Sequence, residues 1–454
     1  MKRKLNLAEL LSVGSMLFGL FFGAGNLIFP ALMGQEAGSN ALPALLGFLV
    51  TGVGLPLLAV ASLGATRSNG LLQLSQKVGR KYGYFFTCAL YLTIGPFFAI
   101  PRCFTVVFET GIAPLLSYGV SRTLALFFFS AVFFVIMLTL SLRPGKILLW
   151  IGKLLTPLFL LVFAGIIGMA LVRPMGSVSV IEPAAGYAAS PFIKGLLEGY
   201  NTMDALAGLA FGIVVINVIS SLGVKDPGNI ASCTLQAGIL SCVLMAVIYA
   251  ATVWAGAQSR ALYPTAENGG AVLTLIAKHY FGDGGAWLLA LMIFFACIKT
   301  AIGLTTSCGE AFVQMFPGKL NYERWVVLFS VVSLTFANLG LNGIIQWSIP
   351  ALMMLYPLAI TLILLALGQR FLRNAPLAYR IVTTFTFICA MGDLLRTLPE
   401  NVRLTLNLSA VTDLFSRILP FYELGMGWVI PALAGLLLSM FMRRTASRGE
   451  AAHH

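Results

Sequence analysis

Side chains able to bind a small charged molecule are concentrated in seven residues of an otherwise apolar stretch. Glu198-Gly-Tyr-Asn-Thr-Met-Asp204 contains two carboxylates, an amide and a hydroxyl. Carboxylates bind cations and ammonium groups, and glycine lets the backbone leave a helix so that its carbonyls become available. Because an ionisable residue inside an apolar stretch is costly to keep there, Asp204 indicates a functional site.

A matching weak point lies in the first apolar stretch. Gly23-Ala-Gly-Asn26 interrupts that stretch, and Pro30 follows about one turn later. In lipid, irregular backbone is tolerated only where it lines a protein cavity. Two interrupted helices in corresponding positions of two halves are typical of an inverted-repeat transporter, with the site between the repeats. The alternative is close helix packing by small residues four positions apart. Such pairs are Gly19 and Gly23, Gly195 and Gly199, and Gly208 and Gly212.

The composition places most of these segments in a bilayer. Hydrophobic residues make up 59% of the 454 residues and charged residues only 10%, which excludes a soluble protein. The net charge of +13 is not gathered with aromatics into a basic cluster, so a nucleic-acid partner is not expected. Seven Cys without a C-x-x-C pair and three His do not predict a metal centre. H-E-x-x-H, G-x-S-x-G and P-loop motifs are absent, so we expect no enzyme.

The apolar stretches between charged residues predict twelve transmembrane helices, because about 20 apolar residues span the hydrocarbon core. The run between Arg324 and Arg370 is too long for one helix, and a turn at residues 338–343 divides it. With both termini in the cytoplasm, 19 Lys and Arg lie inside and 8 outside, as the positive-inside rule requires. Residues 399–422 are compatible with an amphipathic helix on the membrane surface.

Five long motifs occur in order along nearly the whole chain. They are Leu20-Phe-Phe-Gly-Ala-Gly-Asn-Leu-Ile-Phe-Pro30, Gly47-Phe-Leu-Val-Thr-Gly-Val-Gly-Leu-Pro56, Ile94-Gly-Pro-Phe-Phe-Ala-Ile-Pro-Arg102, Glu198-Gly-Tyr-Asn-Thr-Met-Asp-Ala-Leu206 and Thr300-Ala-Ile-Gly-Leu304. The set resembles the bacterial branched-chain amino acid:cation symporter family, the transport system II carriers of the amino acid-polyamine-cation superfamily.

The resemblance implies an all-α polytopic membrane protein with a leucine-transporter-like fold, in which helices 1 and 6 are broken. Two inverted repeats of five helices, at about 8–172 and 190–369, would precede two peripheral helices at about 377–442. Residues 1–442 would form one transmembrane domain and 443–454 a cytoplasmic tail. The implied function is import of leucine, isoleucine and valine across the bacterial inner membrane by cation symport, with Na⁺ as the family's ion. No cofactor and no obligate protein partner are expected.

The chemistry of the two breaks fits a zwitterionic substrate. The N-H groups of the half-helix after the first break suit a carboxylate, and free carbonyls before the second break suit an ammonium. Asp204 either assists the second role or binds the coupling ion. Candidates for an apolar wall are the aromatic residues Phe97, Phe98, Phe294 and Phe295, with helix packing or lipid contact as the alternative. The predicted substrate residues are Gly23, Ala24, Gly25, Asn26, Leu27, Gly199, Tyr200, Asn201, Thr202, Asp204, Phe97 and Phe98.

Arg102 is carried over from the resemblance as a structural or gating residue. Glu109 lies seven residues further on, on nearly the same helix face. We expect the two side chains to be linked by hydrogen bonds or through a third residue.

The resemblance also implies a sodium site between the first and eighth spans. Its residues would be Gly19, Phe22, Ala296, Lys299 and Thr300. Two hydroxyls are expected in the eighth span, and Lys299 stands where one of them should be. Because an ammonium carries the charge of Na⁺ and donates three hydrogen bonds, it is able to replace the ion. The alternative function is therefore a Na⁺-independent carrier, coupled to H⁺ or working by exchange; otherwise Lys299 snorkels or pairs with a carboxylate such as Asp204.

Overall fold

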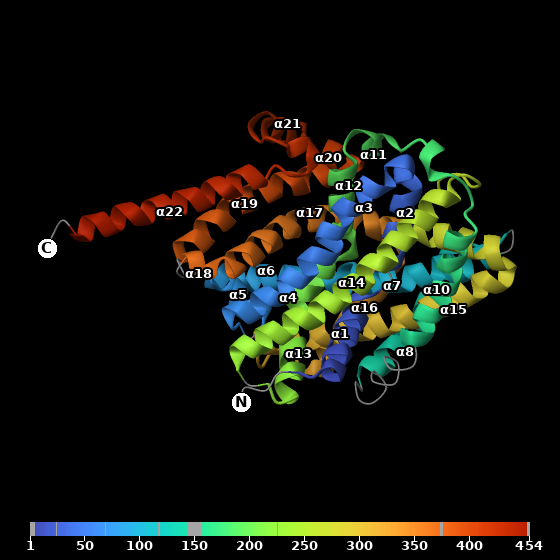
Figure 1. The fold of residues 1–454 in the computed structure, drawn as a ribbon, viewed down its shortest axis with the longest axis horizontal. Helices are drawn as coiled ribbons and strands as arrows, with labels where there is room; N and C mark the ends of the chain where they lie inside the picture. The colour runs from blue at the N-terminus through green and yellow to red at the C-terminus, as the bar shows by residue number, and fades with distance from the viewer. Residues whose placement is uncertain are drawn as a thin grey trace.

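Every regular element in the described part of the chain is a helix (Figure 1). The computed structural model describes residues 5–23, 25–68, 70–116, 119–142, 156–224, 226–372 and 376–451. Ala24, one of the predicted substrate residues, lies outside these ranges. The class predicted from composition, an all-α protein, is confirmed for the described residues.

The first part of the chain forms helices that are repeatedly interrupted by short tighter or wider turns. Three of these turns, η2, η3 and η4, have the wider π geometry that often marks functional segments. The elements are α1 (Leu7–Phe21), α2 (Gly25–Ala37), η1 (Gly38–Asn40), α3 (Ala41–Leu49), η2 (Val50–Gly54), α4 (Leu55–Thr66), α5 (Leu71–Ser75), α6 (Arg80–Leu92), η3 (Thr93–Phe97), α7 (Ala99–Val107), η4 (Phe108–Ile112), η5 (Ala113–Leu115), α8 (Arg122–Ser141) and α10 (Thr156–Val172).

The second part contains the longest helices of the molecule. Its elements are η7 (Val178–Val180), α11 (Ala185–Ala189), α12 (Pro191–Glu198), η8 (Gly199–Thr202), α13 (Asp204–Ser221), α14 (Pro227–Ser259), α15 (Gly269–Met315), α16 (Tyr322–Ala337), α17 (Gly340–Leu367), α18 (Gln369–Leu372), α19 (Pro376–Thr397), α20 (Glu400–Thr405), α21 (Ser409–Ile418), η9 (Tyr422–Leu424) and α22 (Val429–Ala451). The last helix continues into the residues predicted to form a tail.

Several helices are long and apolar enough to cross a membrane. Within the described residues seven helices meet this test by length and composition, and the bent segment Asp204–Ser221 makes an eighth. Helix α8 exposes Phe128 at 66% and Val132 at 61%, while Phe133 on its other side is 1% exposed. Because apolar side chains point both inward and outward, the outer face is suited to lipid rather than to water. The chain is therefore a multi-pass membrane protein.

Glycines in the left-handed region divide two long apolar runs. Gly340, with φ of 73°, separates α16 from α17, so the predicted division of the run between Arg324 and Arg370 is confirmed. Gly282, with φ of 58°, bends α15 in the same way. Only glycine adopts this conformation without a steric penalty, which explains why the chain turns at these residues.

The two predicted breaks are present in the backbone. Helix α1 ends at Phe21 and α2 begins at Gly25, with Pro30 inside α2. Helix α12 gives way to the 3-10 turn η8, and α13 begins at Asp204. Between them, Met203 has φ of 62°, which is unusual for a residue with a side chain and stores strain that the surrounding contacts must hold.

Glycines let the helices around the breaks approach closely. A Cβ atom on Gly34 of α2 would overlap the backbone of Val253 in α14, and one on Gly256 of α14 would overlap Ala31. Gly195 packs closely against α3, while Gly208 and Gly212 pack closely against α4. For these pairs the packing interpretation is correct, because small residues remove the side chains that would keep the backbones apart. Figure 1 shows α2 lying along α14.

Residues 399–422 form two short helices with exposed apolar side chains. Leu414 and Ile418 of α21 are 56% and 63% exposed, and each directly follows a charged residue, Asp413 and Arg417 respectively. Figure 1 shows α20 and α21 at the edge of the helical bundle. This pattern agrees with the predicted amphipathic helix, and its place on the membrane surface stays a prediction.

We predict that Gly256→Ala destabilises the protein by about 1 to 3 kcal/mol, because the new methyl group overpacks the contact between α14 and α2. Gly165→Ala in α10 is the matched control, since nothing lies within 4 Å of a Cβ atom at Gly165. The unfolding midpoint of each purified variant in detergent measures the difference. Equal midpoints for the two variants would contradict the close approach of α2 and α14.

Candidate functional site

The two interrupted helices meet at one cavity in the interior. Residues of α1 and α2, of the η3–α7 segment, of the η8–α13 segment and of α15 contribute to its wall. The lining residues are Phe21, Gly23, Gly25, Asn26, Ile94, Ala99, Arg102, Cys103, Thr202, Met203, Asp204, Ala207, Phe211, Thr300 and Leu304. Both breaks therefore border the same space, although about 180 residues separate them in the sequence.

A closed triangle of hydrogen bonds connects the breaks to α14. Asn26 Nδ2 donates to Asp204 Oδ2 at 2.5 Å and also to the hydroxyl of Tyr249. Tyr249 in turn donates to Asp204 Oδ2 at 3.1 Å. All three side chains are at most 2% exposed. Because buried polar groups are costly unless paired, this triangle fixes α2, α13 and α14 relative to one another.

Side chains also replace the backbone partners that are lost at the breaks. Asn26 Oδ1 accepts a hydrogen bond from the Gly23 N-H at 3.0 Å. Thr202 Oγ1 donates to the Gly199 carbonyl at 2.9 Å and accepts from the Asp204 N-H at 3.4 Å. The residues that weaken the helices in the sequence are thus the ones that satisfy the irregular backbone.

Asp204 is a buried carboxylate at the first residue of α13. The positive end of that helix and the two hydrogen bonds to Oδ2 stabilise its charge. No Lys or Arg of the described residues forms an ion pair with it. A cation or an ammonium group that enters the cavity would therefore meet an acidic partner whose charge no basic side chain neutralises directly.

Arg102 of α7 reaches across the cavity wall to the second break. Its Nη1 donates to the Asn201 carbonyl at 2.5 Å and its Nη2 to Met203 Sδ at 3.6 Å. The guanidinium also lies over the ring of Phe29 in α2, with Cζ 5.0 Å from the ring centroid. Arg102 thus touches the segments on both sides of the cavity.

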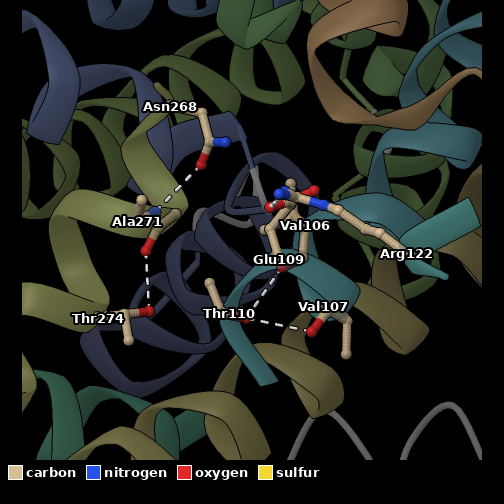
Figure 2. A network of polar contacts seen from close by, with 9 residues as sticks. Val106, Val107, Glu109, Thr110, Arg122, Asn268, Ala271 and Thr274 are labelled. Atoms are coloured by element: carbon tan, nitrogen blue, oxygen red, sulfur yellow. Dashed lines mark hydrogen bonds and ion pairs between the residues drawn. The ribbon is translucent and has the colours of Figure 1, made fainter. Parts of the chain in front are cut away.

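The predicted link between Arg102 and Glu109 is wrong. Glu109 in η4 pairs instead with Arg122 at the start of α8, with Oε2 and Nη2 2.5 Å apart. Figure 2 shows this pair near the start of α15, where Asn268 accepts a hydrogen bond from the Ala271 N-H at 3.1 Å. Seven residues correspond to about 10 Å along a helix, so Glu109 lies two turns beyond Arg102. The guanidinium of Arg102 is directed to the second break instead.

Arg102 is connected to a different carboxylate through a third residue. The backbone carbonyl of Asn201 accepts from Arg102, and the side chain of Asn201 donates to Glu198 Oε1 at 3.1 Å. The second break, rather than the outer end of the third span, is therefore the partner of this arginine. No sequence spacing predicts that contact, because it depends on how α7 packs against η8.

The apolar wall consists of other residues than the predicted aromatics. Phe97 and Phe98, which were expected there, instead pack on Phe336 of α16, with centroids 5.1 and 6.4 Å away. Gly95 is non-helical, so the helix rotates at η3 and presents Ile94 and Ala99 to the cavity. In α13, Ala207 and Phe211 line the cavity three and seven residues after Asp204. That spacing is helical and was available in the sequence.

Other predicted substrate residues surround the cavity without lining it. Leu27 is completely buried beside the first break. Gly199 packs closely against Thr51 of η2. Tyr200 stacks on Tyr356 of α17, with ring centroids 4.0 Å apart. Of the predicted set, Gly23, Gly25, Asn26, Thr202 and Asp204 line the cavity. The sequence did not identify Tyr249 as a residue of the site, because a single tyrosine in an apolar helix is not distinctive.

The residues predicted for the ion site are brought together between α1 and α15. A Cβ atom placed on Gly19 would lie 3.5 Å from Lys299 Nζ, and one on Gly23 would lie 3.3 Å from Thr300 Oγ1. Thr300 donates to the Ala296 carbonyl at 3.0 Å. Phe22 follows the last residue of α1, so its carbonyl is beyond the regular helix. For Gly19 and Gly23 the close neighbours are thus polar side chains of α15 rather than a helix backbone.

Comparison with known proteins decides the family. The family model described as branched-chain amino acid transport protein matches residues 6–446. The chain belongs to this family. Its relatives include the branched-chain amino acid permease BrnQ of Lactobacillus delbrueckii subsp. lactis, which is 57% identical over 95% of this chain and 96% of that protein. The permease BrnQ of Bacillus subtilis is 40% identical over 98% of this chain and its whole length.

The more distant members are also similar along their full length. The permease BrnQ of Escherichia coli K12 is 36% identical over 99% of this chain and 98% of that protein. The family and these relatives are membrane transporters and not enzymes. Among solved structures, the nucleobase-cation-symport-1 family transporter Mhp1, in a closed conformation with bromovinylhydantoin bound, has a TM-score of 0.58. It is 14% identical, over 97% of this chain and 93% of that one, so the likeness concerns the fold.

We predict that Tyr249→Phe lowers the stability of the protein by about 1 to 3 kcal/mol, because Asp204 and Asn26 each lose a buried partner. Tyr379→Phe is the matched control. The hydroxyl of Tyr379 is buried and has no hydrogen-bond partner among the described residues, so its removal should cost little. Unfolding midpoints in detergent give the comparison, and a smaller loss for Tyr249→Phe than for Tyr379→Phe would exclude the triangle as a stabilising contact.

Proposed function

We propose that this protein imports leucine, isoleucine and valine across the bacterial inner membrane by symport with a cation. The observation that carries the proposal is the cavity between the two interrupted helices, which is bordered by Gly25 at the start of α2 and by Asp204. Branched-chain amino acid permeases that are 36 to 57% identical over nearly the whole chain support this substrate class.

The wall of the cavity suits an aliphatic amino acid. The N-H groups at the start of α2 favour a carboxylate, and Asp204 with the carbonyls of η8 favours an ammonium. The lining also contains Phe21, Ile94 and Phe211, which would contact a branched side chain. Gly199, Tyr200, Asn201 and Leu27 would act by holding these groups in place.

The proposed architecture has twelve transmembrane helices, with two inverted repeats of five and two peripheral helices. The broken helices α1–α2 and α12–α13 would be helices 1 and 6 of this arrangement. The excess of Lys and Arg in alternate loops supports cytoplasmic termini. The likeness to Mhp1 is compatible with this arrangement.

The coupling ion has two candidates. By family resemblance it is Na⁺, bound between α1 and α15 by oxygens near Gly19, Phe22, Ala296 and Thr300. The second candidate is a carrier that needs no Na⁺, coupled to H⁺ or working by exchange, in which the ammonium of Lys299 replaces the ion. The position of Lys299 Nζ beside Gly19 favours this alternative.

Uptake of radiolabelled leucine into proteoliposomes tests the substrate class. We expect excess isoleucine or valine to compete, whereas lysine and glutamate should not, because an extra charge would face an apolar wall. Unlabelled leucine inside the vesicles should accelerate entry of label by exchange, which a channel does not do. Uptake that is insensitive to isoleucine and valine would refute the proposal.

We predict that Asp204→Asn reduces leucine uptake at least about 10-fold, because the neutral amide leaves an incoming cation or ammonium without its buried counter-charge. Asp413→Asn on the exposed helix α21 is the matched control and should retain uptake. Both variants should elute as the wild type does on size exclusion. Normal uptake by a folded Asp204→Asn protein would remove Asp204 from the site.

Uptake under imposed Na⁺ or H⁺ gradients separates the two coupling ions. If Lys299 replaces the ion, wild-type uptake should not need Na⁺, and Lys299→Thr should either lose transport or acquire Na⁺ dependence. Lys278→Thr, which removes a surface pair with Asp283, is the control. If Lys299→Thr leaves uptake unchanged with and without Na⁺, this alternative is excluded.

A further inference from the structure

One buried arginine contributes to the wall of the cavity. Arg102 is 3% exposed and lines the cavity together with both helix breaks. The five N-H donors of its guanidinium form a fixed planar fork. Nη1 and Nη2 have the Asn201 carbonyl and Met203 Sδ as acceptors, while Nε has no hydrogen-bond partner among the described residues. A buried donor of a charged group that lacks a partner is costly, which points to an acceptor that arrives with a ligand.

The head of this arginine lies at the start of α2. A Cβ atom placed on Gly25, the first residue of α2, would be only 3.2 Å from Arg102 Nη1. The 13 residues of α2 align their peptide dipoles so that the positive end faces the same place. Two independent sources of positive potential, a full charge and a helix N-terminus, therefore converge on one side of the cavity.

The other charged group of the lining is acidic. Asp204 lies on the η8–α13 side, and no ion pair joins it to Arg102 within the described residues. The lining thus combines one guanidinium and one carboxylate that do not neutralise each other by direct contact. A molecule with an anionic and a cationic group would provide a partner for both the guanidinium and the carboxylate. A simple amine or a simple carboxylic acid would provide a partner for only one of them.

We propose that Arg102 binds the carboxylate of the amino acid substrate and sets the requirement for that group. This inference rests on the proposed function and names one side of its site. A guanidinium makes paired, charge-assisted hydrogen bonds to carboxylates, which gives both strength and orientation. The contact of Arg102 with Asn201 then has a second consequence, since the same side chain would connect the substrate carboxylate to the break before α13.

A purely structural role is the competing interpretation. In that case Arg102 only holds η8 in place through the Asn201 carbonyl. Replacing Arg102 would then lower the binding affinity of every ligand by the same factor. Removing the carboxylate from the ligand and the guanidinium from the protein, separately and together, distinguishes the two roles. Leucine and 3-methylbutylamine, which is leucine without its carboxylate, are the two probes.

The experiment measures the binding of both probes to the purified full-length protein in nanodiscs, by competition with radiolabelled leucine. Wild type is compared with Arg102→Gln and Arg102→Lys. Arg260→Gln is the matched control, because Arg260 is exposed and its side chain hydrogen-bonds to the Tyr263 carbonyl. A variant with low leucine affinity gives no signal in that competition. Its affinity for 3-methylbutylamine is therefore measured directly, as saturable binding of the labelled amine.

For Arg102→Gln we expect leucine affinity to fall at least about 30-fold, while the affinity for 3-methylbutylamine changes less than about 3-fold. Arg102→Lys should restore part of the leucine affinity, because it keeps the charge but loses the planar fork. Equal losses for both probes, or an unchanged leucine affinity, would overturn the role of Arg102 alone. If the wild-type protein bound no leucine, both the proposed function and this inference would be refuted. Unfolding midpoints verify that both Arg102 variants are folded, and if Arg102→Gln is not, the same comparison applies to Arg102→Lys.

Discussion

The hydrogen bond between Asn26 and Asp204 is the contact on which the site depends. It joins two interruptions that are 178 residues apart in the sequence, and both groups are buried in an apolar bundle. In such an environment an unsatisfied backbone group costs several kcal/mol, so two separate breaks would each be unstable. Within each break a side chain satisfies the backbone: Asn26 accepts from the Gly23 N-H, and Thr202 donates to the Gly199 carbonyl. The Asn26–Asp204 hydrogen bond then joins the two breaks, and the cavity lies where they meet.

The helices around the breaks are held by a different kind of contact. Gly34 and Gly256 bring α2 against α14, while Gly195 brings α12 against α3. These approaches are close because there are no side chains between the backbones, and they need no polar partner. The half-helices beyond each break are therefore fixed to rigid neighbours. These backbone contacts therefore hold the half-helices in addition to the buried triangle of Asn26, Asp204 and Tyr249.

Asp204, Arg102 and Lys299 are charged side chains close to the breaks, and their surroundings differ. Asp204 has the N-terminus of α13 and two hydrogen bonds. Arg102 has the Asn201 carbonyl and the ring of Phe29. Lys299 is half-buried, with its ammonium beside Gly19 at the end of α1. Because charged side chains are expensive in a membrane interior, their position beside the two breaks supports the proposal that this region binds charged groups.

The sequence alone determined what depends on local chemistry. The apolar stretches, the turn before Gly340, the two breaks and the presence of Asp204 and Lys299 in apolar segments follow from residue types and spacing. Tertiary structure decided what depends on how helices rotate and pack. The packing of α8 brought Arg122 to Glu109, and the non-helical Gly95 turned Phe97 and Phe98 away from the cavity. The packing of α7 against η8 brought Arg102 to Asn201. A helical face is predictable only while the helix remains regular, and the helices of this protein are irregular where they surround the site.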